Sequence, residues 1–345
     1  MAKLNVLGID LAKNKFQVCK LTPDGTVIYN KMVSRKQLIE LLATEKKALV
    51  AMESCAGTHY WARYAKEHGH KVKAMSARKV KPFRQGHKTD ANDAEAIAIA
   101  ATQPQVKACR LLTVEDQCQQ GIVRMRDLLV KQKTACAKQL RDQLLELGYP
   151  QAQGDAALMR AVPEFLEDAE NQFIDDFRAV LHHQWQHLRA LLVSIAEIEQ
   201  RLTRVTNADQ VCKRLQQLEG VGPVNAMGLK IALNDPEHFK NSRAASACIG
   251  ATPLQHSSGG KDKIGSISKI SGHKKLRSTM YEGSMAVIRQ LEKREARTVK
   301  EQWLKDLIAR RGKKVAAIAL VNKNVRTAYA MLKNGSDYQP AMLAA

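Results

Sequence analysis

Four acidic residues in the first hundred positions have the types and spacing of a metal-binding set. Asp10 and Glu53 each end a short apolar run that is typical of a buried strand. Asp90 and Asp93 lie three positions apart at the expected start of a helix, so their carboxylates share one face. Such a set can converge on a pair of Mg²⁺ ions, which activate a nucleophile and stabilise the leaving oxygen in phosphodiester chemistry.

Each acid also has a simpler interpretation. An Asp at the end of a strand can merely cap a turn, and actin-like sugar kinases also begin with a Gly-Ile-Asp turn like that at 8–10. A helix N-terminus favours acids such as Asp90 and Asp93 for local stability alone. The four acids together favour the metal interpretation, although no single one does. An actin-like phosphotransferase would also need a second Asp-Gly phosphate loop and a Gly-rich adenosine site, and we find neither in the sequence.

A serine in an unusual setting lies far along the chain, in the segment Ser257-Ser258-Gly259-Gly260-Lys261. Two glycines let the backbone approach a phosphate closely, and nearby cations can neutralise the charge that develops on it. The cations in question are Lys261, Lys263, Lys269 and Arg277. Taken alone, a flexible Ser/Gly loop is the better interpretation of this segment. The partners of a hydrolytic triad are not recognisable nearby, which disfavours acyl-transfer chemistry.

Apolar runs and turn residues predict the elements that position the first four acids. We predict strands over 4–9, 15–21, 26–33, 48–53 and 71–76, and helices over 34–44, 58–68, from 90 onward and over 113–147. Ser34 and Gln37 have the spacing of a capping box at the first helix. The resulting β-β-β-α-β-α-β-α order is that of the ribonuclease H fold, in which a mixed sheet carries carboxylates on its central strands.

The middle of the chain is predicted to be a spacer followed by a helix. Residues 151–178 are locally acidic and contain Pro163, which favours a spacer. Further along, apolar residues recur every seven positions, at Leu181, Leu188, Ile195 and Leu202. Glu199 interrupts this recurrence. The pattern indicates either a coiled coil of about three heptads between subunits or an amphipathic helix packed on its own subunit.

The charge composition narrows the choice of partner. The 345 residues include 55 Lys and Arg against 34 Asp and Glu, a net charge of +21, which favours a polyanion. No apolar stretch approaches the length of a spanning helix and no signal peptide precedes the first strand, so nucleic acid is expected and a membrane is not. The seven cysteines are odd in number and have no C-x-x-C spacing, which indicates reduced thiols in a cytoplasm.

Two basic segments adjoin the candidate chemistry. Residues 71–89 contain Lys and Arg but no acid, and they lead directly to Asp90. Residues 261–333 contain 19 Lys and Arg against 6 Asp and Glu, which accounts for more than half of the net charge. A solvated surface explains many of these side chains individually. Their position beside the acids and the serine favours contact with a phosphate backbone.

The turn Leu218-Glu219-Gly220-Val221-Gly222-Pro223 resembles the hairpin of a helix-hairpin-helix motif. Its glycines would let backbone N–H groups approach a phosphate at the start of a helix. A plain turn between two helices is an equally good interpretation. With the basic segments, this gives the following candidate nucleic-acid-binding residues: Lys79, Lys81, Arg84, Lys88, Gly220, Gly222, Lys261, Lys263, Lys269, Lys274, Lys275 and Arg277.

Taken in order, these motifs resemble one known family. The residues that carry the resemblance are Gly-Ile-Asp at 8–10, Glu53, Lys88-Thr89-Asp90-x-x-Asp93, Leu-x-Gly-Val-Gly-Pro at 218–223, Gly250-Ala251-Thr252-Pro253, Ser258-Gly259, Ile-Ser-Lys at 267–269 and Leu276-Arg277. The chain is similar over nearly its whole length to the DEDD transposases of insertion sequences, which are related to the Piv-type DNA invertases. Ala251 is a minor departure, since the family often has Gly-Leu-Thr-Pro there.

The resemblance implies a domain plan and a chemistry. The plan is a RuvC-like α/β domain with the ribonuclease H fold over 1–148, a spacer and coiled-coil helix over 149–205, and a mainly α-helical transposase domain over 206–345. Ser258, which directly precedes the glycine, matches the family's catalytic serine, with Ser257 as the alternative. The family implies a covalent serine–DNA intermediate in a composite centre, built from the RuvC-like and serine sites of different subunits. It also implies a bridge RNA that selects target and donor DNA.

We therefore expect a DNA recombinase or transposase that moves its own insertion sequence, with two Mg²⁺ ions per active site held by the four acids. The expected partners are double-stranded donor and target DNA, a bridge RNA and further copies of the chain in a dimer or tetramer. The expected location is the bacterial cytoplasm, at the nucleoid. The alternatives are a Holliday-junction resolvase or nuclease in which water attacks, an invertase without a guide RNA, and a nucleic-acid-binding architectural protein without chemistry.

Overall fold

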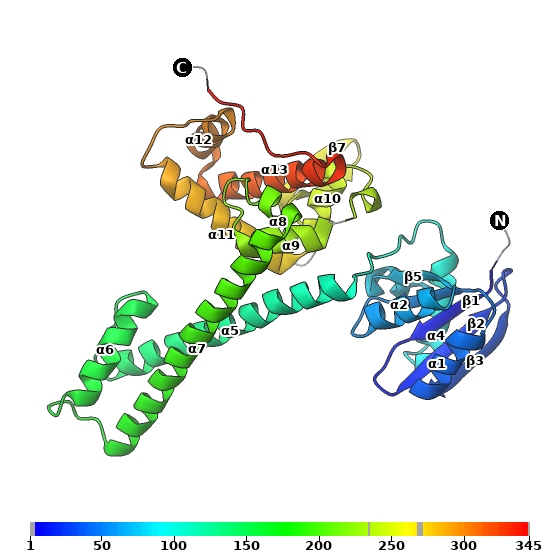
Figure 1. Cartoon of the computed structure of the whole chain (residues 1–345), viewed down its shortest axis with the longest axis horizontal. Helices are drawn as coiled ribbons and strands as arrows, with labels where there is room; N and C mark the ends of the chain where they lie inside the picture. The colour runs from blue at the N-terminus through cyan, green and yellow to red at the C-terminus, as the bar shows by residue number, and fades with distance from the viewer. Residues whose placement is uncertain (1–3, 234, 268–271, 344–345) are drawn as a thin grey trace. The chain divides into compact units, whose positions relative to one another are not determined.

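The strands expected before residue 77 form one five-stranded sheet (Figure 1). The strand order is β3-β2-β1-β4-β5, with β1 antiparallel to β2 and parallel to β4. The strands are β1 (Val6–Asp10), β2 (Lys15–Leu21), β3 (Val27–Ser34), β4 (Leu49–Glu53) and β5 (Lys71–Met75).

The structure is a computed structural model that describes residues 4–233, 235–267 and 272–343. The chain divides into two units, residues 1–114 and 115–345.

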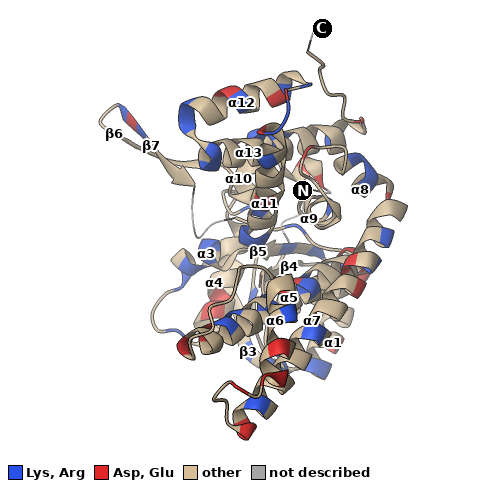
Figure 2. Cartoon of the chain, turned by 90° about the vertical axis from the view of Figure 1, so that its left-hand side faces the viewer, with Lys and Arg blue, Asp and Glu red and all other residues tan. Residues whose placement is uncertain are grey.

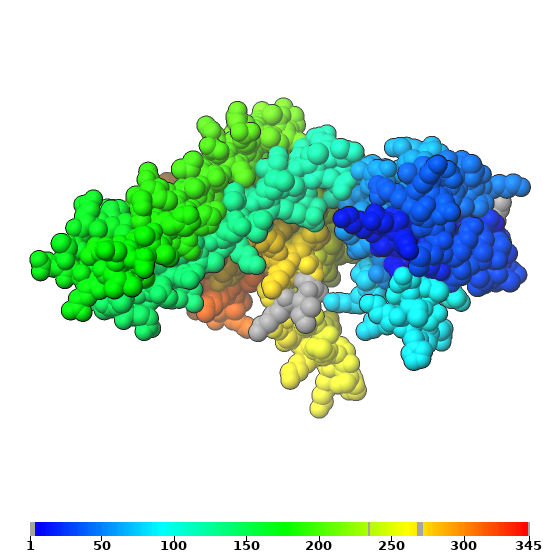
Figure 3. Space-filling view, turned by 90° about the horizontal axis from the view of Figure 1, so that it is seen from below, coloured from blue at the N-terminus to red at the C-terminus, as the bar shows by residue number. Residues whose placement is uncertain are grey.

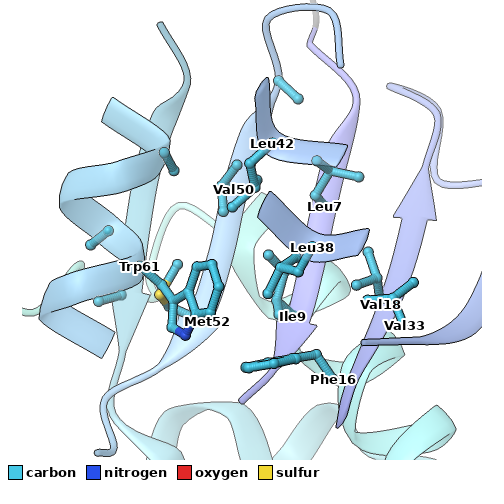
Figure 4. Packing of buried hydrophobic residues seen from close by; sticks show 14 residues of the cluster. Leu7, Ile9, Phe16, Val18, Val33, Leu38, Leu42, Val50, Met52 and Trp61 are labelled. Atoms are coloured by element: carbon cyan, nitrogen blue, oxygen red, sulfur yellow. The ribbon is translucent and has the colours of Figure 1, made fainter. Parts of the chain in front are cut away.

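Helices cover both faces of the sheet. α1 (Arg35–Thr44) and α2 (Thr58–Glu67) pack on one face, where Leu38 and Trp61 meet the apolar side chains of the central strands (Figure 4). α4 (Asp90–Thr102) packs on the other face, after the short α3 (Ala77–Val80) and a 3₁₀ turn at Lys81–Phe83. The expected order of strands and helices is confirmed, and α3 with its 3₁₀ turn is an addition to it. The expected capping box of Ser34 and Gln37 is also present.

Small side chains bring α4 unusually close to the sheet. The buried face of this helix is made largely of alanines, among them Ala94 and Ala98. A Cβ atom built on Gly8 of β1 would lie 2.4 Å from the carbonyl oxygen of Ala94 and 2.6 Å from the Cβ of Ala98. Glycine at position 8 is therefore required by the close approach of helix and strand, and this approach sets where the first turn of α4 lies.

We expect Gly8→Ala to lower the free energy of unfolding by about 1–3 kcal/mol, because the added methyl group meets backbone that cannot move without shifting α4. Chemical denaturation measures this loss. Gly121 in the long helix α5 (Val114–Glu146) is the matched control, since a Cβ there meets nothing within 4 Å. Gly121→Ala should stabilise by roughly 0.5–1 kcal/mol through helix propensity. A Gly8→Ala protein as stable as the wild type would contradict this account of the packing.

Three helices form the first part of the second unit. α5 is followed by α6 (Asp155–Glu167) and α7 (Asp175–Ala208). The prediction of a spacer over 151–178 was wrong for much of this segment, because α6 occupies residues 155–167. Pro163 removes a backbone donor inside α6, yet Leu158 and Val162 are buried against α5 and α7. This tertiary packing offsets the helix-breaking effect of the proline.

The apolar residues that recur every seven positions in α7 are buried within the same chain. Leu181 and Leu188 belong to a buried cluster with residues of α5 and α6, and Ile195 and Leu202 are buried as well. At the interruption of the pattern, Glu199 accepts hydrogen bonds from the guanidinium of Arg126 on α5, at 2.6 and 2.9 Å. Of the two interpretations, packing on the same subunit is therefore the one that the contacts support.

The remainder of the second unit is mostly helical, as expected. Its elements are α8 (Gln210–Leu215), α9 (Pro223–Leu233), a 3₁₀ turn at Pro236–His238, α10 (Ser242–Ile249), β6 (Pro253–Ser258), β7 (Lys261–Ile267), α11 (Lys274–Leu291), α12 (Val299–Arg311) and α13 (Lys313–Asn334). β6 and β7 form an antiparallel hairpin. The Ser/Gly segment 257–261, for which a flexible loop was the better interpretation taken alone, contains its turn. No helix among the described residues combines the length and the hydropathy needed to cross a membrane.

Candidate active site and nucleic-acid-binding surfaces

Side-chain alternation directs the two strand acids toward α4. In β1, Val6 belongs to the cluster on the α4 face and Gly8 touches α4, so Asp10 continues the same face. In β4, Ala51 lies in that cluster and Glu53 follows two positions later. β1 and β4 are parallel neighbours, so both acids lie at the same carboxyl edge of the sheet.

The two helix acids lie in the first turn of α4. Thr89 is the N-cap, and its hydroxyl accepts a hydrogen bond from the backbone N–H of Asn92. Asn30 of β3 donates to the carbonyl oxygen of Ala91 at 2.9 Å, which ties this turn to the sheet. Asp90 and Asp93 are thereby held at the same side of the sheet as the strand acids.

The charges of the four acids influence one another in pairs. Burial raises the pKa of Asp10, and the charges of Asp93 and Asp90 raise it further. Burial likewise raises the pKa of Glu53, with further contributions from Asp10 and Asp93. The positive charge of Lys88 opposes both shifts. Since these shifts require short separations, Asp10 lies within electrostatic reach of the other three acids, and Glu53 lies within reach of Asp93 as well.

The candidate serine lies at the tip of the β6–β7 hairpin. Gly259 and Gly260 form the two-residue turn, with φ of 55° and 74°, the positive values that such hairpin turns demand. Ser258 lies opposite Lys261 and is exposed. In Figure 2 the hairpin extends away from the helices of its unit, and in Figure 3 it stands out from them in yellow. The glycines thus serve the turn itself.

The two neighbouring serines differ in their surroundings. Successive strand residues point to opposite faces, so Ser257 and Ser258 face apart. Ser257 lies opposite Asp262, and its hydroxyl donates to the carboxylate at 2.5 Å, which lowers the pKa of Asp262. Ser258 instead lies opposite a lysine, the side chain that a phosphate would favour.

Comparison with known proteins establishes the family. The family model for the DEDD transposase of IS110, described as a transposase, matches residues 7–149, and the model described as the transposase IS116/IS110/IS902 family matches residues 212–300. The chain is 34% identical over 339 residues to the transposase for insertion sequence element IS1111A of Coxiella burnetii, covering 98% of this chain and 92% of the relative. The chain belongs to the IS110 family of insertion-sequence transposases.

Further relatives agree with this assignment. A probable family 20 transposase of Pseudomonas aeruginosa is 34% identical over 98% of this chain and 99% of its own length. The transposase for insertion sequence element IS1328 of Yersinia enterocolitica is 33% identical over 98% of this chain and 99% of its own length. The protein is therefore a DNA transposase, an enzyme that cleaves and joins DNA, and the family resemblance seen in the sequence is confirmed.

Membership of a DEDD family points to divalent-metal chemistry, and the donor set of this transposase fits it. Four half-buried or exposed carboxylates supply the hard oxygen ligands that such cations prefer. A cation among them would offset the burial and the mutual repulsion that raise the pKa of Asp10 and Glu53. Within the described residues, no three His, Cys, Asp or Glu side chains are gathered tightly enough to hold a metal as they stand. Asp93 is instead paired with Arg84 at 3.1 Å.

We expect a divalent cation to raise the melting temperature of the wild-type transposase and to have less effect on Asp10→Asn, because the cation binds the folded carboxylates. Without metal, Asp10→Asn should melt higher than the wild type at neutral pH. A carboxyl whose pKa is raised by folding destabilises the folded state above that pKa. This cost is lost as the pH falls through the raised pKa, so the difference between the two proteins should close in acid.

Thermal denaturation with MgCl₂ or EDTA across the carboxyl range of pH measures both effects. Glu67→Gln, at an exposed acid at the end of α2, is the matched control and should show neither. An Asp10→Asn protein that is stabilised by metal as strongly as the wild type would remove Asp10 from the metal site.

Most of the candidate nucleic-acid-binding lysines of the transposase are exposed. Those in the first unit lie on α3, on the 3₁₀ turn that follows it and just before α4; those in the second unit lie on β7 and at the start of α11. They are Lys79, Lys81, Lys88, Lys261, Lys263, Lys274 and Lys275. Lys275 also lies 3.6 Å from a carboxylate oxygen of Asp127 on α5. Lys269 falls outside the described residues.

Other candidates have structural contacts of their own. Arg277 is 7% exposed, and its guanidinium donates to the carbonyl oxygens of Ile249 and Gly250, at the end of α10. A Cβ on Gly220 would lie 2.6 Å from the carbonyl oxygen of Gly283 on α11, so this glycine serves close packing. Gly222 is exposed with open space around it, which leaves its backbone accessible to a phosphate.

Sequence reasoning missed the group that fixes the turn at 218–223. The ammonium of Lys300 donates to Glu219 at 2.5 Å and to Asn324 at 2.6 Å, and the hydroxyl of Tyr338 donates to Glu219 at 2.8 Å. Asn324 in turn donates to the backbone oxygen of Glu219. These residues lie 81–119 positions from Glu219 along the chain, so no local pattern could have indicated them.

Proposed function

We propose that this transposase cuts and rejoins DNA through a serine–DNA intermediate formed by Ser258, with the four acids as its metal site. Asp10, Glu53, Asp90 and Asp93 would hold two Mg²⁺ ions, which when bound supply charge stabilisation to the scissile phosphate and to the attacking hydroxyl. The Ser258 oxygen attacks phosphorus, and the bond from phosphorus to the leaving DNA oxygen breaks. Rejoining reverses this step: a DNA hydroxyl attacks the same phosphorus and the serine is released.

One combination of features carries this proposal. In a chain that belongs to a transposase family, an electrostatically coupled group of four acids occurs together with a serine at the exposed tip of a basic hairpin. A covalent route suits recombination because the bond energy is kept and no end is released to water. The family resemblance supports an assembly in which the acids and the serine come from different subunits of a dimer or tetramer.

We also propose that the first unit has the RuvC-like form of the ribonuclease H fold. Its five-stranded mixed sheet, with β1 between an antiparallel and a parallel neighbour and with acids at the carboxyl ends of β1 and β4, supports this assignment. The acids of α4 complete the set on the same face. In such a site the protein holds the phosphate, and the cleaved sequence is selected by other means.

We propose that a bridge RNA selects the DNA sequences that are cleaved and joined. The exposed cations give affinity for any phosphate backbone without information on bases. The test is recombination between defined donor and target DNA by purified protein, with RNA transcribed from the flank of the element, with a scrambled RNA of equal length, or without RNA. Site-specific products are expected only with the flank RNA, whereas salt-sensitive duplex binding should need no RNA. Equal, site-specific recombination without RNA would make the enzyme a directly reading invertase.

A further inference from the structure

A groove of about 440 Å³ opens at the carboxyl edge of the sheet, in the segments that directly follow Asp10 of β1 and Glu53 of β4. Its walls are the segments that follow β1 and β4, residues 11–13 and 55–57, together with the side chains of Arg35, Tyr60 and Trp61. Its size falls within the ~300–1,000 Å³ of sites that bind small molecules. None of the motifs found in the sequence includes its aromatic residues or Arg35.

The groove adjoins two of the four acids along the chain. Leu11 directly follows Asp10, and Cys55 lies two positions after Glu53. Both segments leave the same carboxyl edge of the sheet, because β1 and β4 are parallel neighbours. A DNA strand with a phosphate at Asp10 and Glu53 would therefore place a neighbouring nucleotide near the groove.

The groove presents an aromatic surface with a cation already in place. Tyr60 is 43% exposed, whereas Trp61 is 2% exposed and is anchored in the core beside Met52 and Phe16 (Figure 4). The two neighbouring rings meet edge to face, with centroids 5.2 Å apart. The guanidinium of Arg35 lies 5.2 Å from the Tyr60 ring centroid and 4.9 Å from that of Trp61. This contact orients the cation before any ligand arrives.

The charged side chains that line the groove are both cationic. Its lining residues include Lys13 and Arg35 and no acid. Gly57, with φ of 90°, is the N-cap of α2 and provides no side-chain cap, so the start of this ten-residue helix also faces an anion favourably. An exposed aromatic ring, two cations and a helix N-terminus together match a nucleotide: the ring stacks on the base, and the positive groups hold its phosphate.

We propose that this groove binds an unpaired base of the DNA strand that the acids cleave, with Tyr60 as the stacking surface and Arg35 and Lys13 as phosphate contacts. The proposal rests on the metal role proposed for the four acids, since adjacency to Asp10 and Glu53 identifies the strand as DNA. A base reaches Tyr60 only after it leaves the duplex, so the groove stabilises the separated strand during exchange. Tyr60 and Arg35 are then positioning residues that hold the strand in register with the scissile phosphate.

Photo-crosslinking of the full-length protein tests this directly. A single-stranded DNA oligonucleotide that contains 5-iododeoxyuridine should crosslink at Tyr60 in the wild type, as mapped by peptide mass spectrometry. Tyr60→Ala should weaken oligonucleotide binding roughly 5- to 100-fold, the range of one base–aromatic stack. Tyr60→Phe keeps the ring and should keep the affinity. Tyr60 is partly exposed, so these variants should fold, and thermal denaturation checks that they do.

Lys31→Ala is the matched control, because Lys31 makes a similar contact with Tyr29 on β3, at 4.6 Å, outside the groove lining. It should leave both crosslink and affinity unchanged. Asp90→Asn should lose recombination and keep the crosslink at Tyr60, which separates failure of the metal role from failure of the groove. Crosslinks that map elsewhere, with Tyr60→Ala binding as tightly as the wild type, would overturn the proposal. A crosslink at Tyr60 with a matched RNA but not with DNA would overturn the assignment of the strand.

Discussion

Replacing any one of Asp10, Glu53, Asp90 and Asp93 by its amide is expected to lower the rate of strand cleavage roughly 10²–10⁴-fold. A ligand carboxylate in a metal site contributes several kcal/mol to stabilisation of the transition state, and each 1.36 kcal/mol corresponds to a factor of ten. The amide keeps the shape of the side chain and removes the charge. Folding and duplex binding should persist, because the amide has the same shape as the acid that it replaces and because a carboxylate repels phosphate.

Cleavage of a labelled DNA substrate that carries the element's ends, with RNA transcribed from the element's flank added to one set of reactions, measures this loss. Glu67→Gln, which changes charge in the same unit on an exposed surface, should cleave like the wild type. Asp93 needs one more comparison because it is paired with Arg84. Arg84→Gln breaks the same pair and keeps the carboxylate, so it should lose less activity than Asp93→Asn. Full activity in any amide variant would remove that residue from the metal site.

Much of the first unit could be predicted because its signals are local. Short apolar runs that end at Asp10 and Glu53 indicate buried strands, and the Ser34–Gln37 capping box marks where α1 begins. The helix that carries Asp90 follows an N-cap threonine. Since strand ends and helix starts are set within a few residues, the placement of two acids at strand ends and of two in the first turn of a helix followed from the same signals.

Elements that depend on distant contacts were not predictable in this way. α6 forms despite Pro163 because α5 and α7 bury one of its faces. The β6–β7 hairpin has exposed, polar strands without apolar alternation, so its only strong local signal is the Gly259-Gly260 turn. The same holds for Gly220 and Arg277, whose packing partners lie 63 and 27–28 positions away in the chain. From the sequence, Gly220 and Arg277 were predicted to bind nucleic acid. In the structure, Gly220 packs closely against α11, and Arg277 donates hydrogen bonds to carbonyl oxygens at the end of α10.

Ser258→Ala is expected to abolish both recombination and any protein–DNA adduct that survives denaturation, whereas Ser257→Ala should retain substantial activity. Without the Ser258 hydroxyl no bond to phosphorus can form, and alanine at this exposed hairpin position disturbs little else. Loss of the Ser257 hydroxyl removes one exposed hydrogen bond to Asp262, which is worth about 1 kcal/mol or less. Denaturing gel electrophoresis of end-labelled DNA after incubation with each protein measures the adduct.

The hairpin makes this pair of variants unusually informative. Ser257 and Ser258 are adjacent, exposed and on opposite faces of the hairpin, so the two substitutions remove hydroxyls that point in opposite directions from equally exposed positions. An adduct that survives in Ser258→Ala and disappears in Ser257→Ala would move the nucleophile to the face shared with Asp262, whose carboxylate would then accept the serine proton. Free DNA ends without an adduct in the wild type would instead indicate attack by water at the four acids, the chemistry of a resolvase. Each outcome thus assigns the attacking oxygen to one face of the hairpin or to solvent.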